Sequence, residues 1–306
     1  MSDRKKLRIA FTENMLLGEM KMLDPNEKQV LVDLKTVLDS LDLPRLMVGA
    51  GARLLIFDRQ YNREGRATKD WDFAVSVKSW SDFKILCDRL TLGENPRFKV
   101  AHKVPHKFIH LETDVEVDIV PFGEIGQPGQ EIEWEDGLTI NLLGLEEALR
   151  FAKEQVIDDD LVISVVDYPA FLGLKLIAWS DRGGNKDLKD VDFMIEGIAD
   201  RGIYDNRILE ELLNENEMAE GQVEYDSTAS TFLLGRDIRR IFHDATVSKI
   251  NEVLSEILKN RDIVIPQLIP RTVTDNKQWD DNFDAIVQRF EVLQHGIQSP
   301  PSQDNT

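Results

Sequence analysis

RATKDWDFAV, residues 66–75, places Asp70 and Asp72 directly before an apolar run that is typical of a buried strand. Residues two apart in a strand point to the same face, so the two aspartates share one face, while Trp71 and Phe73 share the other. The apolar face belongs to the core. We therefore expect the two carboxylates side by side at the start of the strand, with Cα atoms roughly 6–7 Å apart.

A third carboxylate comes from a later strand. In VEVDIV, residues 115–120, apolar residues alternate with Glu116 and Asp118. If this strand neighbours the first, Asp118 completes a cluster of three carboxylates, which repel by up to about 4 kcal/mol per pair at 4 Å and an effective dielectric near 20. Such a cluster needs a cation or a proton, and its hard oxygen ligands suit Mg²⁺ or Mn²⁺. The alternative is that Asp70 and Asp72 are solvated acids at a strand end, as most Asp-x-Asp pairs are.

The glycines of MVGAGARLL, residues 47–55, mark a turn from a strand into a helix. This geometry lets backbone N–H groups approach an anion, although a tight turn that needs positive φ explains the same glycines. A dinucleotide-binding fingerprint is a weaker interpretation, because Leu54 replaces its third glycine and Asp70 precedes its strand. Between the glycines and the acids, Arg66 is best placed to neutralise the charge of a triphosphate.

This combination resembles the nucleotidyltransferase fold of the polymerase-β type. The quoted residues are a strand-Gly-helix turn, Arg-x-Thr-x-Asp-x-Asp-Phe at 66–73, and a later strand with a single aspartate. More narrowly, residues 45–197 resemble the AbiEii/AbiGii toxin family of bacterial nucleotidyltransferases. That family adds a Lys-containing helix and a Lys-Asp-x-x-Asp helix, matched here by LGLKLIAWSDR (172–182) and NKDLKDVDF (185–193). LLGRDI, residues 233–238, also resembles this subgroup, without a chemistry that we can assign.

The resemblance implies transfer of a nucleoside monophosphate from a nucleoside triphosphate to an acceptor hydroxyl, with Mg²⁺ or Mn²⁺ as cofactor. It implies a tRNA end or a protein as acceptor, and a toxin of a toxin–antitoxin or phage-defence pair with a cognate antitoxin. The alternatives are an inactive, nucleotide-binding relative that acts through partners, and a small-molecule nucleotidyltransferase of the antibiotic-modifying kind. The expected catalytic residues are Asp70, Asp72, Asp118 and Lys175, the three aspartates being the metal ligands. The expected nucleotide-binding residues are Gly49, Ala50, Gly51, Arg66, Thr68, Arg182, Lys186, Asp187 and Asp190.

Three features bear on these assignments. The wider superfamily usually has Gly-Gly or Gly-Ser at the turn, whereas this chain has Gly49-Ala50, so backbone donors remain but a serine hydroxyl does not. The helix around Lys175 is apolar nearly all round, so its ammonium either reaches solvent or lies against an anion, for which a triphosphate is a candidate. On the next helix Asp190 and Asp192 diverge by about 200°, so they should not form a second metal site.

The fold class that follows is α/β (α+β): a nucleotidyltransferase fold with a small mixed sheet flanked by helices, followed by a mainly helical C-terminal domain. We expect an N-terminal extension (1–23), a nucleotidyltransferase domain (24–197), a helical domain (198–296) and a mobile tail (297–306). The spacing of apolar residues predicts one continuous helix over 144–156, GLEEALRFAKEQV.

The net charge of -19 weighs against a broad nucleic-acid footprint. A locally basic stretch that includes Arg97, Lys99 and Lys107 is the best candidate for an RNA contact, and a solvated sheet edge explains it equally well. Cys87 is the single cysteine, so no disulfide framework exists. Since neither a signal-peptide core nor a bilayer-spanning run is seen, we expect a cytoplasmic protein without a membrane partner.

Overall fold

The computed structural model describes residues 23–63, 65, 68, 70–102, 104–135, 137–158, 161–212 and 228–299. Arg66, predicted to bind nucleotide, lies outside the described residues. So do most of the predicted N-terminal extension and of the predicted tail.

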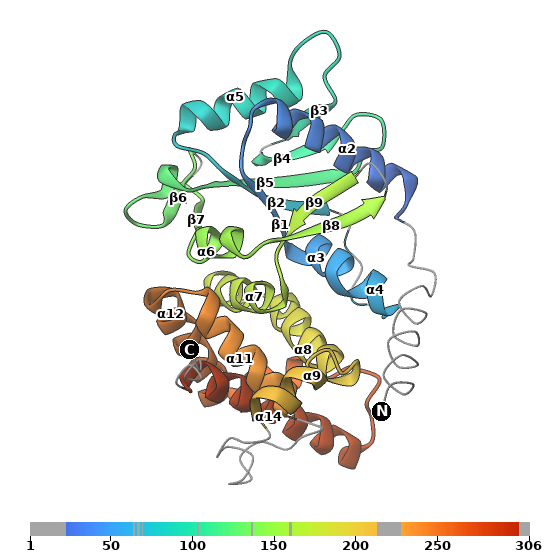
Figure 1. Cartoon of the computed structure of the whole chain (residues 1–306), viewed down its shortest axis with the longest axis vertical. Coiled ribbons are helices and arrows are strands. Elements are labelled where there is room, and N and C mark those ends of the chain that lie inside the picture. The colour runs from blue at the N-terminus through green and yellow to red at the C-terminus, as the bar shows by residue number, and fades with distance from the viewer. Residues whose placement is uncertain are drawn as a thin grey trace, which may run out of the picture.

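A mixed sheet occupies the upper part of the molecule in Figure 1. Among the described residues it has seven strands in the order β3-β4-β5-β2-β1-β9-β8. Strand β2 runs parallel to β5 and β1 parallel to β9, whereas the other neighbours are antiparallel. The strands are β1 (Arg45–Val48), β2 (Asp70–Ser76), β3 (Phe98–Ala101), β4 (Val104–His110), β5 (Glu116–Phe122), β8 (Lys153–Asp158) and β9 (Leu161–Val165). The α/β fold class with a mixed sheet is confirmed, and the antiparallel β1–β2 pair excludes the dinucleotide-binding interpretation, whose sheet is parallel.

Two helices that pack against each other cover one side of this sheet, α2 (Pro25–Ser40) and α5 (Trp80–Thr91) (Figure 1). Asp24 caps α2 by accepting a hydrogen bond from the backbone N–H of Asn26, and Ser79 caps α5 in the same way. The apolar residues of α2 recur at helical spacing and enter the core, as the sequence predicts. A short hairpin, β6 (Glu131–Glu133) and β7 (Thr139–Asn141), follows a 3₁₀ turn, η2 (Glu124–Gly126).

The predicted helix over 144–156 is wrong in its second half. Helix α6 (Leu145–Arg150) ends early, and the chain continues as the edge strand β8. Leu145, Ala148 and Ala152 do lie at helical spacing, but β8 pairs antiparallel with β9, so that Gln155 lies opposite Ile163. The local pattern of β8 contains no residue that breaks a helix. Pairing with β9, which follows in the chain, nevertheless makes this segment a strand.

Helices form the lower part of the molecule in Figure 1. They are α7 (Tyr168–Arg182), α8 (Asn185–Asp200), α9 (Asp205–Arg207), η3 (Ile208–Leu212), α11 (Ala229–Ile241), α12 (Asp244–Lys259), α13 (Arg261–Val264), η4 (Ile265–Gln267) and α14 (Asn276–Gln298). The mainly helical C-terminal part is confirmed. The predicted domain boundary at residue 197 falls inside α8, which packs on α7, α11 and α14, and the boundary stays a prediction.

The LLGRDI segment has a packing role. Gly235 on α11 crosses Gly296 on α14 so closely that an added Cβ on Gly235 would lie 2.4 Å from the Leu293 carbonyl oxygen. Asp237 accepts hydrogen bonds from the Tyr204 hydroxyl at 2.8 Å and from the Arg207 guanidinium. The motif therefore ties the C-terminal helices together.

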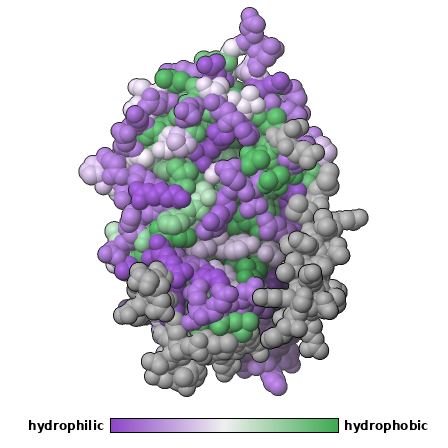
Figure 2. All heavy atoms as spheres, viewed as in Figure 1, coloured by the Kyte–Doolittle hydropathy of each residue, from purple (hydrophilic) through white to green (hydrophobic). Residues whose placement is uncertain are grey.

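Hydrophilic side chains cover most of the face shown in Figure 2, with smaller groups of hydrophobic ones among them. Within the described ranges, none of the helices has the length and apolar character needed to cross a bilayer.

Candidate active site

Strands β2 and β5 bring the three predicted carboxylates together. In the parallel register Asp70 lies opposite Glu116 and Asp72 lies opposite Asp118. Residues paired in this way point to the same face of the sheet, while Trp71, Phe73 and Val117 are buried on the other. One carboxylate oxygen from each of Asp70, Asp72 and Asp118 lies within 4.8 Å of the other two. The predicted cluster is therefore present.

The glycine turn packs directly on this cluster. After β1 the chain turns at Gly49, whose φ is +69°, into a continuous helical segment made of α3 (Gly49–Arg53), a π-helical part η1 (Leu54–Asp58) and α4 (Arg59–Tyr61). A Cβ on Gly49 would lie 2.0 Å from Oδ2 of Asp72. Glycine is thus required here both by the left-handed backbone and by the carboxylate against it. Gly51 has another role, because its added Cβ would lie 2.6 Å from the Trp71 ring.

The cluster perturbs the protonation of its own members. Burial, together with the charges of Asp70 and Asp118, raises the pKa of Asp72 to about 7, although the charges of Lys175 and Arg182 oppose the shift. Burial also raises the pKa of Asp118. Like charges held together in a partly desolvated place favour a proton or a bound cation.

A lysine ammonium lies against the same carboxylates. Lys107 on β4 lies opposite Asp118, and its Nζ is 3.1 Å from Oδ1 of Asp118, 3.8 Å from Oδ2 of Asp70 and 2.7 Å from Oε2 of Glu116. Burial lowers the pKa of Lys107, but its hydrogen bond to Glu116 and its ion pair with Asp118 outweigh burial and raise that pKa. The Lys107 ammonium is thus a cation held by two of the three clustered carboxylates.

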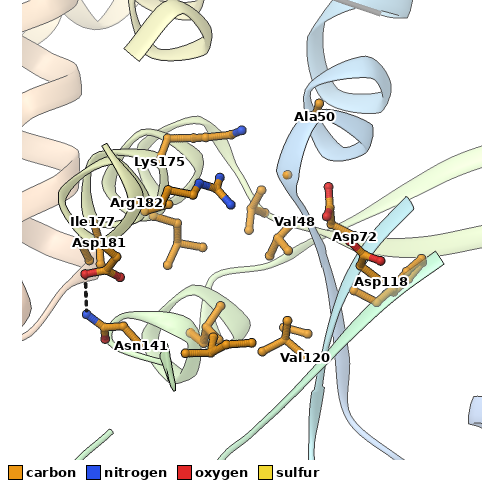
Figure 3. Close-up of a pocket in the computed structure, with 18 of the residues that line it drawn as sticks. Val48, Ala50, Asp72, Asp118, Val120, Asn141, Lys175, Ile177, Asp181 and Arg182 are labelled. Atoms are coloured by element: carbon orange, nitrogen blue, oxygen red, sulfur yellow. Dashed lines mark hydrogen bonds between the residues drawn. The ribbon is translucent and has the colours of Figure 1, made fainter. Parts of the chain in front are cut away.

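A cavity of about 570 Å³ opens beside the carboxylates. Figure 3 shows Asp72 and Asp118 on one side of it and Lys175 and Arg182 of α7 on the other. Apolar side chains form much of its wall. The predicted residues that line it are Gly49, Ala50, Thr68, Asp70, Asp72, Asp118, Lys175, Arg182 and Lys186. Thr68 also donates a hydrogen bond from its hydroxyl to Oδ1 of Asp70 at 2.8 Å, which orients that carboxylate.

Lys175 has carboxylate partners within the protein. Its Nζ is 3.1 Å from Oδ1 of Asp187 and 2.8 Å from Oδ2 of Asp190, and all three residues are buried. Arg182 donates two hydrogen bonds of 2.7 Å to Asp187, and Arg53 donates one to Asp190. Burial raises the pKa of Asp187, but the hydrogen bonds and charges of Arg182 and Lys175 outweigh burial and hold that pKa below its usual range.

This network changes the role expected of two predicted nucleotide-binding residues. Asp187 and Asp190 are not among the described residues that line the cavity. They are buried and hold the Lys175 ammonium by ion pairs. Of the two alternatives for Lys175, its ammonium therefore lies against an anion, which the carboxylates of Asp187 and Asp190 supply. Asp192 points elsewhere, to Arg289, so the predicted divergence from Asp190 is confirmed.

Three residues of this site do not follow from the sequence. The sequence places Lys107 in an RNA-binding or edge stretch and does not single out Asn141 and Asp181. Both of these line the cavity and are joined by a hydrogen bond of 3.4 Å (Figure 3). Strand alternation is the sequence pattern that points to Lys107. It places Lys107 and the neighbouring Phe108 on opposite faces of the sheet, so that Lys107 lies on the polar face that Asp118 shares. His110 at the end of β4 is buried and forms a hydrogen bond with Asp33.

Comparisons with solved structures find nucleotidyltransferase-like proteins. An antigenic nucleotidyltransferase-like protein from Paracoccidioides brasiliensis is 19% identical, with a TM-score of 0.38, over 57% of this chain and 77% of that one. JHP933 from Helicobacter pylori is 11% identical, with a TM-score of 0.38, over 91% of this chain and 94% of that one. The antibiotic-resistance factor ANT(2'')-Ia is 13% identical, with a TM-score of 0.33, over 65% of this chain and 97% of that one. No family model and no curated protein matches the sequence, so membership of the AbiEii/AbiGii family stays a prediction.

Proposed function

We propose that this protein is a metal-dependent nucleotidyltransferase that moves a nucleoside monophosphate from a nucleoside triphosphate to an acceptor hydroxyl. The observation that carries the proposal is the convergence of three carboxylates, within 4.8 Å of one another, at a cavity whose opposite wall presents the cations Lys175 and Arg182. Carboxylates alone repel a triphosphate and cations alone do not hold a metal ion. Their placement on two sides of one cavity suits a triphosphate bound together with a divalent ion.

Asp70, Asp72 and Asp118 would hold Mg²⁺ or Mn²⁺, since the donor set consists of hard oxygens and already attracts the Lys107 ammonium. When bound, such ions neutralise phosphate charge and align attacking and leaving oxygens. In the proposed reaction the acceptor oxygen bonds to the α-phosphorus while the bond from that phosphorus to the bridging oxygen breaks. Pyrophosphate leaves with the electron pair, and the hydroxyl proton passes to the carboxylate of Asp118.

The cations of α7 would stabilise the charge that develops on pyrophosphate. Asp187 and Asp190 fix Lys175 so that its ammonium is preorganised, which is the condition under which a charge lowers a reaction barrier effectively. Arg182 is held by Asp187 in the same network, and Lys186 lies at the cavity wall. Gly49 and Ala50 would offer backbone N–H groups to the phosphates, and Arg66 stays a predicted nucleotide-binding residue.

The finer parts of the proposal concern the acceptor and the biological setting. We infer from the sequence resemblance that the acceptor is a tRNA end or a protein hydroxyl and that the protein is a toxin with a cognate antitoxin. The net charge of -19 argues for an acceptor bound over a small area rather than along an extended polyanion.

The test is a transfer assay. The protein is incubated with each α-labelled nucleoside triphosphate and Mg²⁺ or Mn²⁺, in the presence of total tRNA, of purified proteins, or of small polyhydroxy compounds. We expect pyrophosphate release with label on tRNA or protein, and loss of both in Asp72→Asn. Both should be retained in Asp88→Asn, which changes an acid on α5 whose side chain is 44% exposed. Label confined to low-mass alcohols favours the antibiotic-modifying type. Nucleotide binding without pyrophosphate release favours an inactive relative and contradicts the proposal.

A further inference from the structure

Lys107 lies in the same row of the sheet as two of the proposed metal ligands. Asp72 on β2, Asp118 on β5 and Lys107 on β4 lie opposite one another across three neighbouring strands. Side chains in such a row share one face, so the direction of the Lys107 side chain toward the carboxylates follows from the strand register. Its side chain is 20% exposed, and three carboxylates surround its ammonium.

The ammonium and a divalent ion need the same oxygens. Asp118 and Asp70 belong to the metal-binding cluster, whereas Glu116 does not, although it makes the closest contact to Lys107, at 2.7 Å. An ion bound by Asp70 and Asp118 would repel the ammonium at this short range. Glu116 offers the ammonium a partner that it can keep when the other two carboxylates turn to the ion.

Another lysine nearby shows the contrast with an ordinary surface pair. Lys99 on the neighbouring strand β3 is 53% exposed and lies 3.9 Å from Asp114, itself 84% exposed. Exposed pairs of this kind contribute little and do not compete for the half-buried carboxylate cluster. Lys99 therefore serves as the matched control for the loss of one positive charge.

We propose that Lys107 is a built-in competitor for the divalent ion: it neutralises the carboxylates of Asp70 and Asp118 in the free protein and withdraws to Glu116 when the ion binds. This inference rests on the metal site of the proposed function. It makes Lys107 a positioning residue that keeps the mutually repelling carboxylates together before an ion arrives, at the expense of affinity for that ion. Binding of the ion without nucleotide is then weak.

The test measures Mn²⁺ binding to the full chain without nucleotide, by electron paramagnetic resonance of free Mn²⁺. We expect Lys107→Met to bind Mn²⁺ at least about tenfold more tightly, because one positive charge a few ångströms from a divalent ion is removed. Lys107→Arg, which keeps the charge, and Lys99→Met should stay within about threefold of the unmodified protein. Glu116→Gln should weaken binding, and it should do so less in the Lys107→Met background, because no ammonium then needs a second partner.

Thermal unfolding keeps the test decisive if Lys107→Met is unstable without an ion. The melting temperature of that variant should be lower than that of the unmodified protein in chelator and should rise more on addition of Mn²⁺. Equal or weaker Mn²⁺ binding by Lys107→Met, or an equal or smaller rise in its melting temperature, overturns the inference and leaves the metal site standing. Absence of Mn²⁺ binding in every form, the unmodified protein included, overturns the metal site and the inference with it.

Discussion

Substitution of Gly49 by alanine separates backbone strain from damage to the carboxylate cluster. Gly49 has φ +69°, and an alanine Cβ there would lie 2.0 Å from Oδ2 and 2.6 Å from Cγ of Asp72. An ordinary carbon–oxygen contact is about 3.3 Å or longer, so the carboxylate must move by more than about 1 Å. Gly183 is the matched control, because its φ is +65° and no atom lies within 4 Å of an added Cβ.

Both alanine variants should lose about 1–2 kcal/mol of unfolding free energy from the left-handed backbone. Only Gly49→Ala should lose function, by about 100-fold, because a misplacement of 1 Å at a reacting centre costs roughly that factor. The assays are urea unfolding, Mn²⁺ binding and pyrophosphate release. If Gly49→Ala binds Mn²⁺ and releases pyrophosphate as well as Gly183→Ala does, the Asp72 carboxylate does not lie against Gly49.

Three further perturbations test other parts of the structure. Lys175→Met should lower the unfolding free energy by about 3 kcal/mol in urea titration, since it leaves two buried carboxylates short of a cation. Lys84→Met, which changes an exposed lysine, should leave the unfolding free energy nearly unchanged. Equal losses in the two variants would contradict the buried network. Burial and neighbouring charges raise the pKa of Asp72 to about 7, so protons compete with the ion for this carboxylate. The Mn²⁺ affinity measured by calorimetry should therefore rise with pH up to about 7 and level off above it. A flat profile from pH 5.5 to 7.5 would argue against Asp72 as a ligand. The same raised pKa predicts that the metal-free protein loses stability as pH rises through this range, since the folded state then binds more protons than the unfolded state. In Gly296→Ala the added Cβ would lie 2.1 Å from the Phe232 carbonyl oxygen. This variant should lose about 2 kcal/mol of unfolding free energy in thermal unfolding, while its Mn²⁺ affinity stays unchanged. An unchanged unfolding free energy would mean that α11 and α14 cross less closely.

The carboxylate cluster was predictable from the sequence because its causes are local. Strand periodicity places Asp70 and Asp72 on one face, and the same alternation in β5 places Asp118 on a polar face. The single further condition, that the two strands are neighbours, came from the resemblance to a known fold. The parallel register then brings Asp72 opposite Asp118.

The parts that escaped prediction depend on pairing between distant segments. Lys107 reaches the cluster only because β4 pairs with β5, and one strand alone carries no information about its neighbour. In the same way, β8 has a helical pattern and becomes a strand only against β9. The partners of Lys175 come from α8, so its environment required the packing of two helices. Local periodicity assigns faces, and tertiary pairing decides what each face meets.

In the proposed function, Asp70, Asp72 and Asp118 together bind a divalent ion at the cavity that takes a nucleoside triphosphate. A crystal structure of the protein grown with Mn²⁺ and a non-hydrolysable triphosphate analogue tests it directly through anomalous scattering. We expect Mn²⁺ ligated by these three carboxylates, with the phosphates between them and Lys175. A bound nucleotide with no Mn²⁺ at the three aspartates, or Mn²⁺ held by other residues, would contradict it.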